Sequence, residues 1–236
     1  MKVTVINGSP RKGNTYAATQ IFKNEMSACG KVEFTEFFLP QDMPKFCVGC
    51  TSCFDNGENT CPNSEHTMPI FKSMLDADAI IITTPVYVMQ AAGAVTTFLN
   101  HSGYLSLVHR PHREMFRKKA FVLSTTSAAG AKAAIKPIVT VLKNMGINRV
   151  YSSAVTMKAS AWSSMNLKLK EKLESELKTS ARRFYQDVAS GKKHRPYMKT
   201  KLLFTVFRNA YKRAAHVDTL DVKHWIEKDL INKSPF

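Results

Sequence analysis

The sequence has no long apolar run. None of its stretches reaches the roughly 18 to 20 consecutive apolar residues that a membrane-spanning helix needs. The N-terminus also lacks the charged start, apolar stretch and small-residue cleavage site of a secretory leader, because residues 2–6 already form a β-branched run and residues 7–10 a turn signal. We therefore expect a cytoplasmic protein with no stable membrane insertion.

Acidic residues are scarce. The chain has 18 Asp and Glu against 34 Lys and Arg, a formal net charge of +16. Such a surface attracts anions, including acidic proteins, acidic lipids and phosphorylated small molecules, although many of the lysines can simply solvate helix faces. No block of Lys and Arg is interleaved with aromatic residues as in RNA-binding sheets, so we expect no nucleic-acid partner.

The hydrophobic pattern alternates between strand and helix. The alternation, together with the continuous apolar run at 79–82, predicts an α/β fold with a doubly wound, mainly parallel sheet covered by helices on both faces. We expect Pro85 to end the third strand. The predicted strands lie at 2–6, 32–38, 79–83, 120–125 and 150–156, and the helices at 15–28, 68–75, 91–100, 132–145 and 166–190. These elements predict one domain over residues 1–190 and a basic helical extension over residues 191–236.

The first strand is followed by a loop with small and polar residues, Gly8 to Thr15, that leads into a helix. Free amides and the helix dipole at such a helix start favour a phosphate. Asn14 stands where a nucleoside-triphosphatase loop has its lysine, and the Gly-x-Gly-x-x-Gly fingerprint of dinucleotide-binding folds is absent. The loop therefore favours a monophosphate held by hydroxyls and amides, the alternative being an ordinary turn capped by Asn14 or Thr15.

Two further loops rich in small polar residues follow the third and fourth predicted strands, at 83–88 and 125–130. Ligands of open α/β sheets bind beyond the carboxyl ends of the strands, where the strand order reverses. We expect the three loops to converge there, the first binding phosphate and the other two holding a flat ring.

The loop Gly8–Thr15, the segment Cys47–Cys53, and Ala77-Asp78 leading to Pro85–Tyr87 together resemble one family over roughly residues 1–130. It comprises the NADPH-dependent FMN reductases of the flavodoxin-like fold, including the iron–sulfur flavoproteins. The resemblance implies a five-stranded sheet of order 2-1-3-4-5 and a homodimer. Asp221, Trp225 and Ile226 resemble a shorter signature of some members.

Carried over residue by residue, the resemblance implies three groups of FMN contacts. No side-chain acid or base is obligatory, so we assign no catalytic residue; Tyr87 either donates to a substrate or, as we favour, packs on the ring. Asn100-His101 stand where the family often has an Asp-Arg pair. The expected contacts are Ser9, Arg11, Gly13, Asn14 and Thr15 to the phosphate, Pro85, Val86, Tyr87 and Val88 to the isoalloxazine ring, and Thr125, Thr126 and Gly130 to its polar edge or the ribityl chain.

Four of the five cysteines, Cys47, Cys50, Cys53 and Cys61, fall within fifteen residues. Their spacing fits a [4Fe-4S] cluster that relays single electrons. Zinc is an alternative with no clear role in hydride chemistry. The reading that we favour assigns no metal and treats the cysteines as reduced structural thiols. Cys29 lies late in the first predicted helix, without a partner in the motif.

The extension contains a basic amphipathic helix between 199 and 216. Its apolar residues recur at helical spacing, with most of the basic residues off that face. Such a helix either lies on an anionic membrane or packs on the domain or a dimer partner. We favour packing.

The preferred functional hypothesis is an FMN-dependent oxidoreductase that takes hydride from NAD(P)H and reduces a small-molecule electron acceptor, such as a flavin, a quinone or another electrophile. The alternative is a non-enzymatic flavin and iron–sulfur electron carrier with an acidic protein partner. A third hypothesis is a nucleotide-binding regulator without redox chemistry.

Overall fold

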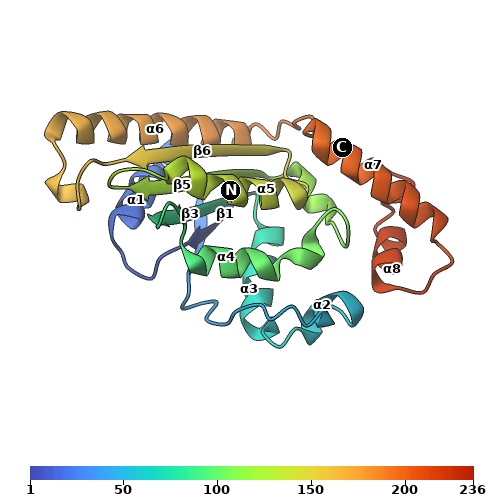
Figure 1. Cartoon of the computed structure of the whole chain (residues 1–236). Helices are drawn as coiled ribbons and strands as arrows, with labels where there is room; N and C mark the ends of the chain where they lie inside the picture. The colour runs from blue at the N-terminus through green and yellow to red at the C-terminus, as the bar shows by residue number, and fades with distance from the viewer.

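The computed structural model describes all residues from 1 to 236 and has a central parallel sheet (Figure 1). Its strands run in the order β2-β1-β3-β5-β6. Because β4 is a short hairpin strand off this path, the parallel strands follow the predicted flavodoxin-like order 2-1-3-4-5. The parallel strands are β1 Lys2–Asn7, β2 Glu33–Phe38, β3 Ala79–Tyr87, β5 Lys119–Thr126 and β6 Arg149–Thr156.

Helices cover both faces of the sheet, as the sequence predicts. On one face α1 Asn14–Cys29 and α6 Leu167–Ala189 pack against alternate residues of β1, β3 and β5. The opposite face is covered by α3 Ser64–Asp76, α4 Gly93–His101 and α5 Ala131–Asn144. The central strands β1, β3 and β5 are buried on both sides over most of their length, which explains the continuous apolar run in β3.

The prediction that Pro85 ends the third strand is wrong. β3 continues through Pro85 to Tyr87 and turns back into β4 Gln90–Ala91, which the sequence did not reveal. The carbonyl of Thr83 points toward β1 and accepts from the Gly8 amide at 2.8 Å. Pro85 lies two residues on and points the same way, but β1 has already ended there, so the missing N–H of proline leaves no ladder partner unsatisfied.

The C-terminal extension packs on the connection between α4 and β5. It contains α7 Met198–Arg213 and α8 Leu220–Glu227 (Figure 1). Trp225 is fully buried and stacks between the rings of Phe204 and Tyr211. The same cluster includes Leu107 and Phe116 from the connection. No helix in the chain is both long enough and apolar enough to span a bilayer.

The remaining elements are short. A four-residue helix, α2 Ser52–Asp55, lies within residues 47–61, which carry Cys47, Cys50, Cys53 and Cys61 and are called the cysteine segment below. Short 3-10 helices fill the connections at Glu58–Thr60, Gly103–Leu105, Arg113–Arg117 and Trp162–Ser164.

Two histidines between the domain and α8 make stability depend on pH. Burial lowers the pKa of His112 from 6.5 to about 4, and His224 at a ring distance of 5.2 Å adds to this; burial also lowers the pKa of His224. The unfolded chain therefore binds more protons than the folded chain below pH 6.5. We expect the free energy of unfolding to fall as the pH decreases from about 6.5 to about 4, by at most about 1.4 kcal/mol per unit for each histidine.

Urea unfolding between pH 7 and pH 4 measures this dependence. The substitution His112→Asn should flatten the profile, whereas His216→Asn, at an exposed histidine, should leave it unchanged. An unaltered profile in His112→Asn would refute the assignment.

Candidate functional site

A cavity of about 570 Å³ lies at the carboxyl ends of the parallel strands. This volume is within the range of small-molecule and cofactor sites. Its walls come from the ends of β3 and β5 and from the segments after β1, β5 and β6, so all three segments expected from the sequence converge there. The lining residues are Ser9, Arg11, Gly13, Asn14, Thr15, Pro85, Val86, Tyr87, Thr125, Thr126, Ser127, Met157, Ser160 and Ala161.

The loop after β1 is fixed against β3 at Gly8. A Cβ atom on this residue would lie 2.3 Å from Val95 Cγ2 and 2.4 Å from the Thr83 carbonyl oxygen, so only glycine allows this approach. The helix α1 then begins after Gly13, and no side chain caps it. The first amides of α1 are thus free to bind an anion at the positive end of the helix dipole.

Asn14 lines the cavity, and its side chain holds a neighbouring part of the cavity wall in place. Its amide nitrogen donates to the carbonyl of Ser160 at 2.8 Å, and its amide oxygen accepts from the backbone N–H of Trp162 at 2.7 Å. Both ends of the side chain therefore bind the loop between β6 and α6. The backbone amide of Asn14 remains one of the uncapped groups at the start of α1.

Most of the polar side chains that line the cavity carry a hydroxyl group. Thr15 Oγ1 and Thr125 Oγ1 lie 2.6 Å apart and join α1 to the end of β5. The Thr126 hydroxyl donates to the carbonyl of Ala129 at 2.7 Å and so shapes the following loop. The Ser9 hydroxyl accepts from the Arg11 amide at 3.3 Å. Neutral donors of this kind suit a phosphate monoester and a polyhydroxylated chain.

One group of lining residues is largely apolar. It is formed by Pro85, Val86 and Tyr87 at the end of β3. The Arg11 guanidinium donates to the Tyr87 hydroxyl at 3.3 Å and is the only cationic group among the lining residues. An apolar wall beside a cationic and hydroxyl-rich loop fits a ring that carries a phosphate.

Two predicted ligands lie outside this lining. Val88 is 94% exposed and adopts a left-handed conformation at the tip of the β3–β4 hairpin. Gly130 has a φ of 95° at the start of α5, and a Cβ atom there would lie 2.8 Å from Val86 Cγ1. Gly130 therefore allows α5 to approach the hairpin that carries the apolar wall.

Four lining residues were not among the predicted ligands. Ser127 belongs to a loop that the sequence had indicated, but Met157, Ser160 and Ala161 follow β6. The three residues after β6 could have been predicted, because the carboxyl end of the fifth parallel strand must lie at the same edge of the sheet as the others.

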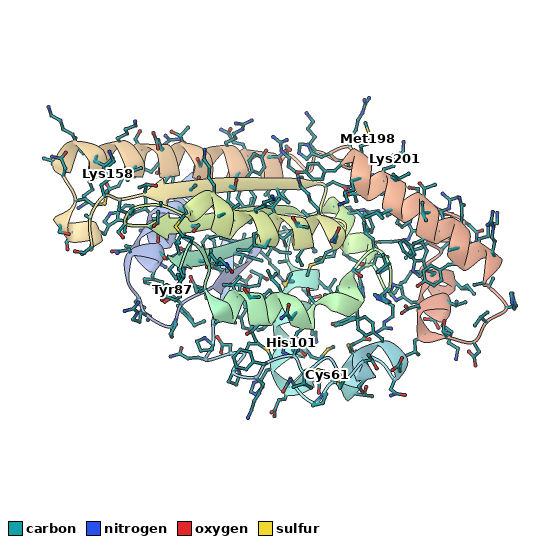
Figure 2. The ribbon with its side chains drawn as sticks, viewed as in Figure 1. Cys61, Tyr87, His101, Lys158, Met198 and Lys201 are labelled. Atoms are coloured by element: carbon teal, nitrogen blue, oxygen red, sulfur yellow. The ribbon has the colours of Figure 1, made fainter.

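The cysteine segment forms a second cavity, of about 70 Å³. Cys47, Cys50, Cys53 and Cys61 all line it, together with His101 at the end of α4. Figure 2 shows Cys61 and His101 away from Tyr87. Burial, and next the charge of Cys61, raise the pKa of the Cys53 thiol. All five cysteines are free, and no three Cys, His, Asp or Glu side chains are close enough together to bind a metal ion.

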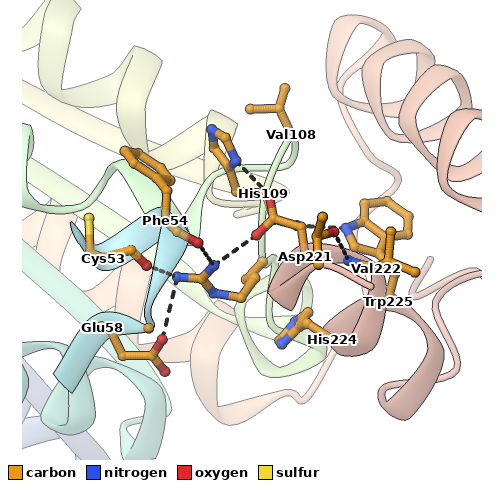
Figure 3. A network of polar contacts seen from close by, with 12 residues as sticks. Cys53, Phe54, Glu58, Val108, His109, Asp221, Val222, His224 and Trp225 are labelled. Carbon is orange, nitrogen blue, oxygen red and sulfur yellow. Dashed lines mark hydrogen bonds and ion pairs between the residues drawn. The ribbon is translucent and has the colours of Figure 1, made fainter. Parts of the chain in front are cut away.

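An ion-pair network ties the cysteine segment to the C-terminal extension (Figure 3). Arg110, only 5% exposed, donates to the carbonyls of Cys53 and Phe54 and to Asp221 Oδ1, the last at 2.8 Å. The second oxygen of Asp221 bonds His109 Nδ1 at 2.8 Å. Burial alone would raise the pKa of Asp221, but the hydrogen bond and charge of His109 and the charge of Arg110 hold it below its usual value.

Sequence comparison finds relatives along the chain. The family model of the NADPH-dependent FMN reductases matches residues 1–161. An iron–sulfur flavoprotein of Clostridioides difficile is 23% identical over 98% of this chain and 100% of its own length. An iron–sulfur flavoprotein of Methanocaldococcus jannaschii is 37% identical over 37% of this chain and 44% of its own length.

Solved structures share the fold at low sequence identity. An apo NADH:FMN oxidoreductase superposes with a TM-score of 0.60 at 18% identity, covering 85% of this chain and 98% of its own. An FMN-dependent NADH-azoreductase from Bacillus anthracis in complex with FMN gives 0.59 at 10% identity, covering 78% of this chain and 100% of its own. The family match over most of the chain, with the converging loops and their uncapped helix, places this chain in the NADPH-dependent FMN reductase family.

Proposed function

We propose that the protein is an FMN-dependent oxidoreductase that takes hydride from NAD(P)H and reduces a small-molecule acceptor, such as a flavin, a quinone or another electrophile. The main support is the cavity at the carboxyl ends of the strands, where the loop after β1 and the apolar residues Pro85 and Val86 line the same space. FMN, when bound, supplies the hydride and single-electron chemistry.

The donor set of the cavity fits FMN. The uncapped start of α1, the Ser9 hydroxyl and the Arg11 guanidinium would hold the phosphate. Thr125, Thr126 and Ser127 line the side of the cavity where the polar edge of the ring or the ribityl chain would lie. Tyr87, 41% exposed at the rim, would pack on the ring and leave the opposite face open to NAD(P)H and the acceptor.

The direct test is an absorption spectrum of anaerobically purified protein before and after addition of NADH or NADPH. We expect bands near roughly 375 and 450 nm, as for any bound flavin, and rapid bleaching by the nicotinamide. Slow bleaching together with facile one-electron reduction would favour the electron carrier. A protein that contains no flavin and takes up none would refute the proposal and favour a nucleotide-binding regulator.

Arg11 offers a sharper test of the phosphate assignment. We expect Arg11→Ala to raise the FMN dissociation constant about tenfold to a hundredfold, because one charge-assisted hydrogen bond contributes about 1.5–3 kcal/mol. Lys12→Ala is the matched control, since the Lys12 ammonium lies 5.6 Å from the Tyr16 ring centroid and does not line the cavity. Fluorescence titration of the apoprotein with FMN measures both. Equal effects of the two variants would contradict the assignment.

The four cysteines support a second candidate, an iron–sulfur flavoprotein that relays single electrons. They line one cavity, and several relatives carry this name. In the present conformation, however, the thiols do not form a metal-binding group. We therefore propose reduced structural thiols. Iron and acid-labile sulfide assays separate the two, since a cubane cluster requires about four irons per chain.

Two expectations about the whole protein accompany this proposal. We expect a homodimer, as the family resemblance implies, and a cytoplasmic location. Exposed Val88 and Met89 at the tip of the β3–β4 hairpin offer apolar surface beside the cavity for a partner subunit. Analytical ultracentrifugation tests the dimer.

A further inference from the structure

The helix α7 has a second apolar face that nothing in the chain covers. Its inner face packs on the domain through Phe204, which is 1% exposed. On its outer face Met198, Leu202 and Val206 follow one another at four-residue spacing, and are 88%, 63% and 52% exposed. Residues four apart lie on the same side of a helix, so the three side chains form a continuous apolar stripe.

The stripe lies within the most basic part of the chain. Residues 188–217 contain eight Lys and Arg and no Asp or Glu, which accounts for half of the net charge of +16. Seven of the eight are exposed, and none of these seven pairs with a carboxylate. They are Lys192, Lys193, Arg195, Lys199, Lys201, Lys212 and Arg213.

The position of α7 separates this surface from the redox site. Tyr197, just before α7, accepts from the backbone N–H of Val150 at the amino end of β6, whereas the cavity lies at the carboxyl ends of the strands. Figure 2 shows Met198 and Lys201 at the end of the molecule opposite Tyr87 and Lys158. An acidic redox partner must approach the flavin, so this surface does not suit it.

A second copy of the chain fits the surface poorly as well. If two α7 helices packed stripe to stripe, they would bring two clusters of unpaired cations together, which is electrostatically unfavourable. An apolar stripe flanked by lysines instead matches the boundary between acyl chains and anionic headgroups.

We propose that the outer face of α7 docks on a membrane surface that carries anionic lipid headgroups. Leu202 and its neighbours enter the headgroup region, and the lysines beside them bind the phosphate groups. The helix lies in the plane of the interface and does not cross the bilayer, in keeping with its length and composition. The cavity at the far end of the sheet then remains open to its substrates.

Co-sedimentation of the full-length, FMN-loaded protein with lipid vesicles tests the proposal. We expect binding to vesicles of equal parts phosphatidylglycerol and phosphatidylcholine, little binding to phosphatidylcholine alone, and release at high salt. Lys199→Gln with Lys201→Gln should weaken binding at least about tenfold. Leu202→Gln with Val206→Gln should weaken it by a similar factor, on the order of tenfold.

The matched control is Leu167→Gln with Lys168→Gln at the start of α6, where Leu167 is 67% exposed. This pair should bind vesicles as the parent protein does. All substituted side chains are exposed, so the flavin spectrum and the thermal midpoint should not change.

Four results would overturn the proposal. The first two are the absence of binding to phosphatidylglycerol vesicles and an equal loss of binding in the control pair. The third is binding to polyglutamate that depends on the lysines but not on Leu202 and Val206. The fourth is a homodimer that dissociates when Leu202→Gln and Val206→Gln are introduced together. The third result would indicate an acidic protein partner, and the fourth an interface between copies.

Discussion

Replacing Asp221 with alanine will lower the free energy of unfolding by about 3–5 kcal/mol, because it leaves the buried Arg110 guanidinium without its closest carboxylate. Glu58, at 3.5 Å, is the only other carboxylate near Arg110. His109 and Tyr211 lose a hydrogen-bond partner on the same carboxylate. Urea unfolding at pH 7 measures the change.

The matched control for this variant is Asp218→Ala. Asp218 belongs to the same segment and pairs with Lys223 at 2.7 Å, but its side chain is 80% exposed. Surface ion pairs contribute little to stability, so the control should unfold close to the parent protein. Equal losses in the two variants would show that Asp221 acts as an ordinary surface residue.

The Asp221→Ala variant also tests the link between the C-terminal extension and the cysteines. Arg110 holds the carbonyls of Cys53 and Phe54, so its release should loosen α2 and expose the Cys53 thiol. Alkylation of Cys53, followed by mass spectrometry, should become faster in Asp221→Ala and not in Asp218→Ala. The exposed Cys29 provides an internal reference in each sample. An unchanged rate at Cys53 would refute the link.

Replacing Gly8 with alanine will weaken FMN binding at least about a hundredfold. The new Cβ would lie 2.3 Å from Val95 and 2.4 Å from the Thr83 carbonyl oxygen, so the phosphate loop must move away from β3. A displaced loop that loses two phosphate hydrogen bonds loses about 1.5–3 kcal/mol for each. Strain of this kind also lowers the free energy of unfolding by about 1–3 kcal/mol.

Gly93→Ala is the control for Gly8→Ala. It makes the same change at the start of α4, the helix that carries Val95, but no atom lies within 4 Å of its added Cβ. FMN titration and thermal unfolding of both variants give the comparison. Parent-like affinity in Gly8→Ala would mean that the close approach of the loop to β3 is not required for FMN binding.

Much of the fold could be predicted from local sequence patterns. The apolar run from Ala79 to Ile82 predicts a strand buried on both faces, and the parallel sheet follows from its alternation with helices. The loop Gly8–Thr15 before the first helix could be predicted as well, since its small residues and the helix start are adjacent in the chain. The family resemblance then added the prediction that the cofactor is FMN.

The features that the sequence did not reveal depend on neighbours distant in sequence. Pro85 was expected to end β3, but the strand continues because β1 ends beside it. Both ends of the Asn14 side chain bind a loop almost 150 residues away. The partners of Arg110 come from the cysteine segment and from α8. No local signal in the sequence identifies such pairings.

The sequence by itself determined the class of fold, the small-residue loop before the first helix and the excess of positive charge, because these follow from periodicity, adjacency and composition. Only the tertiary structure decided which apolar face of α7 is buried, which loops line the cavity, and that the cysteine segment is held by the C-terminal extension. These features are contacts between distant segments, and their free energies arise only once the chain has folded.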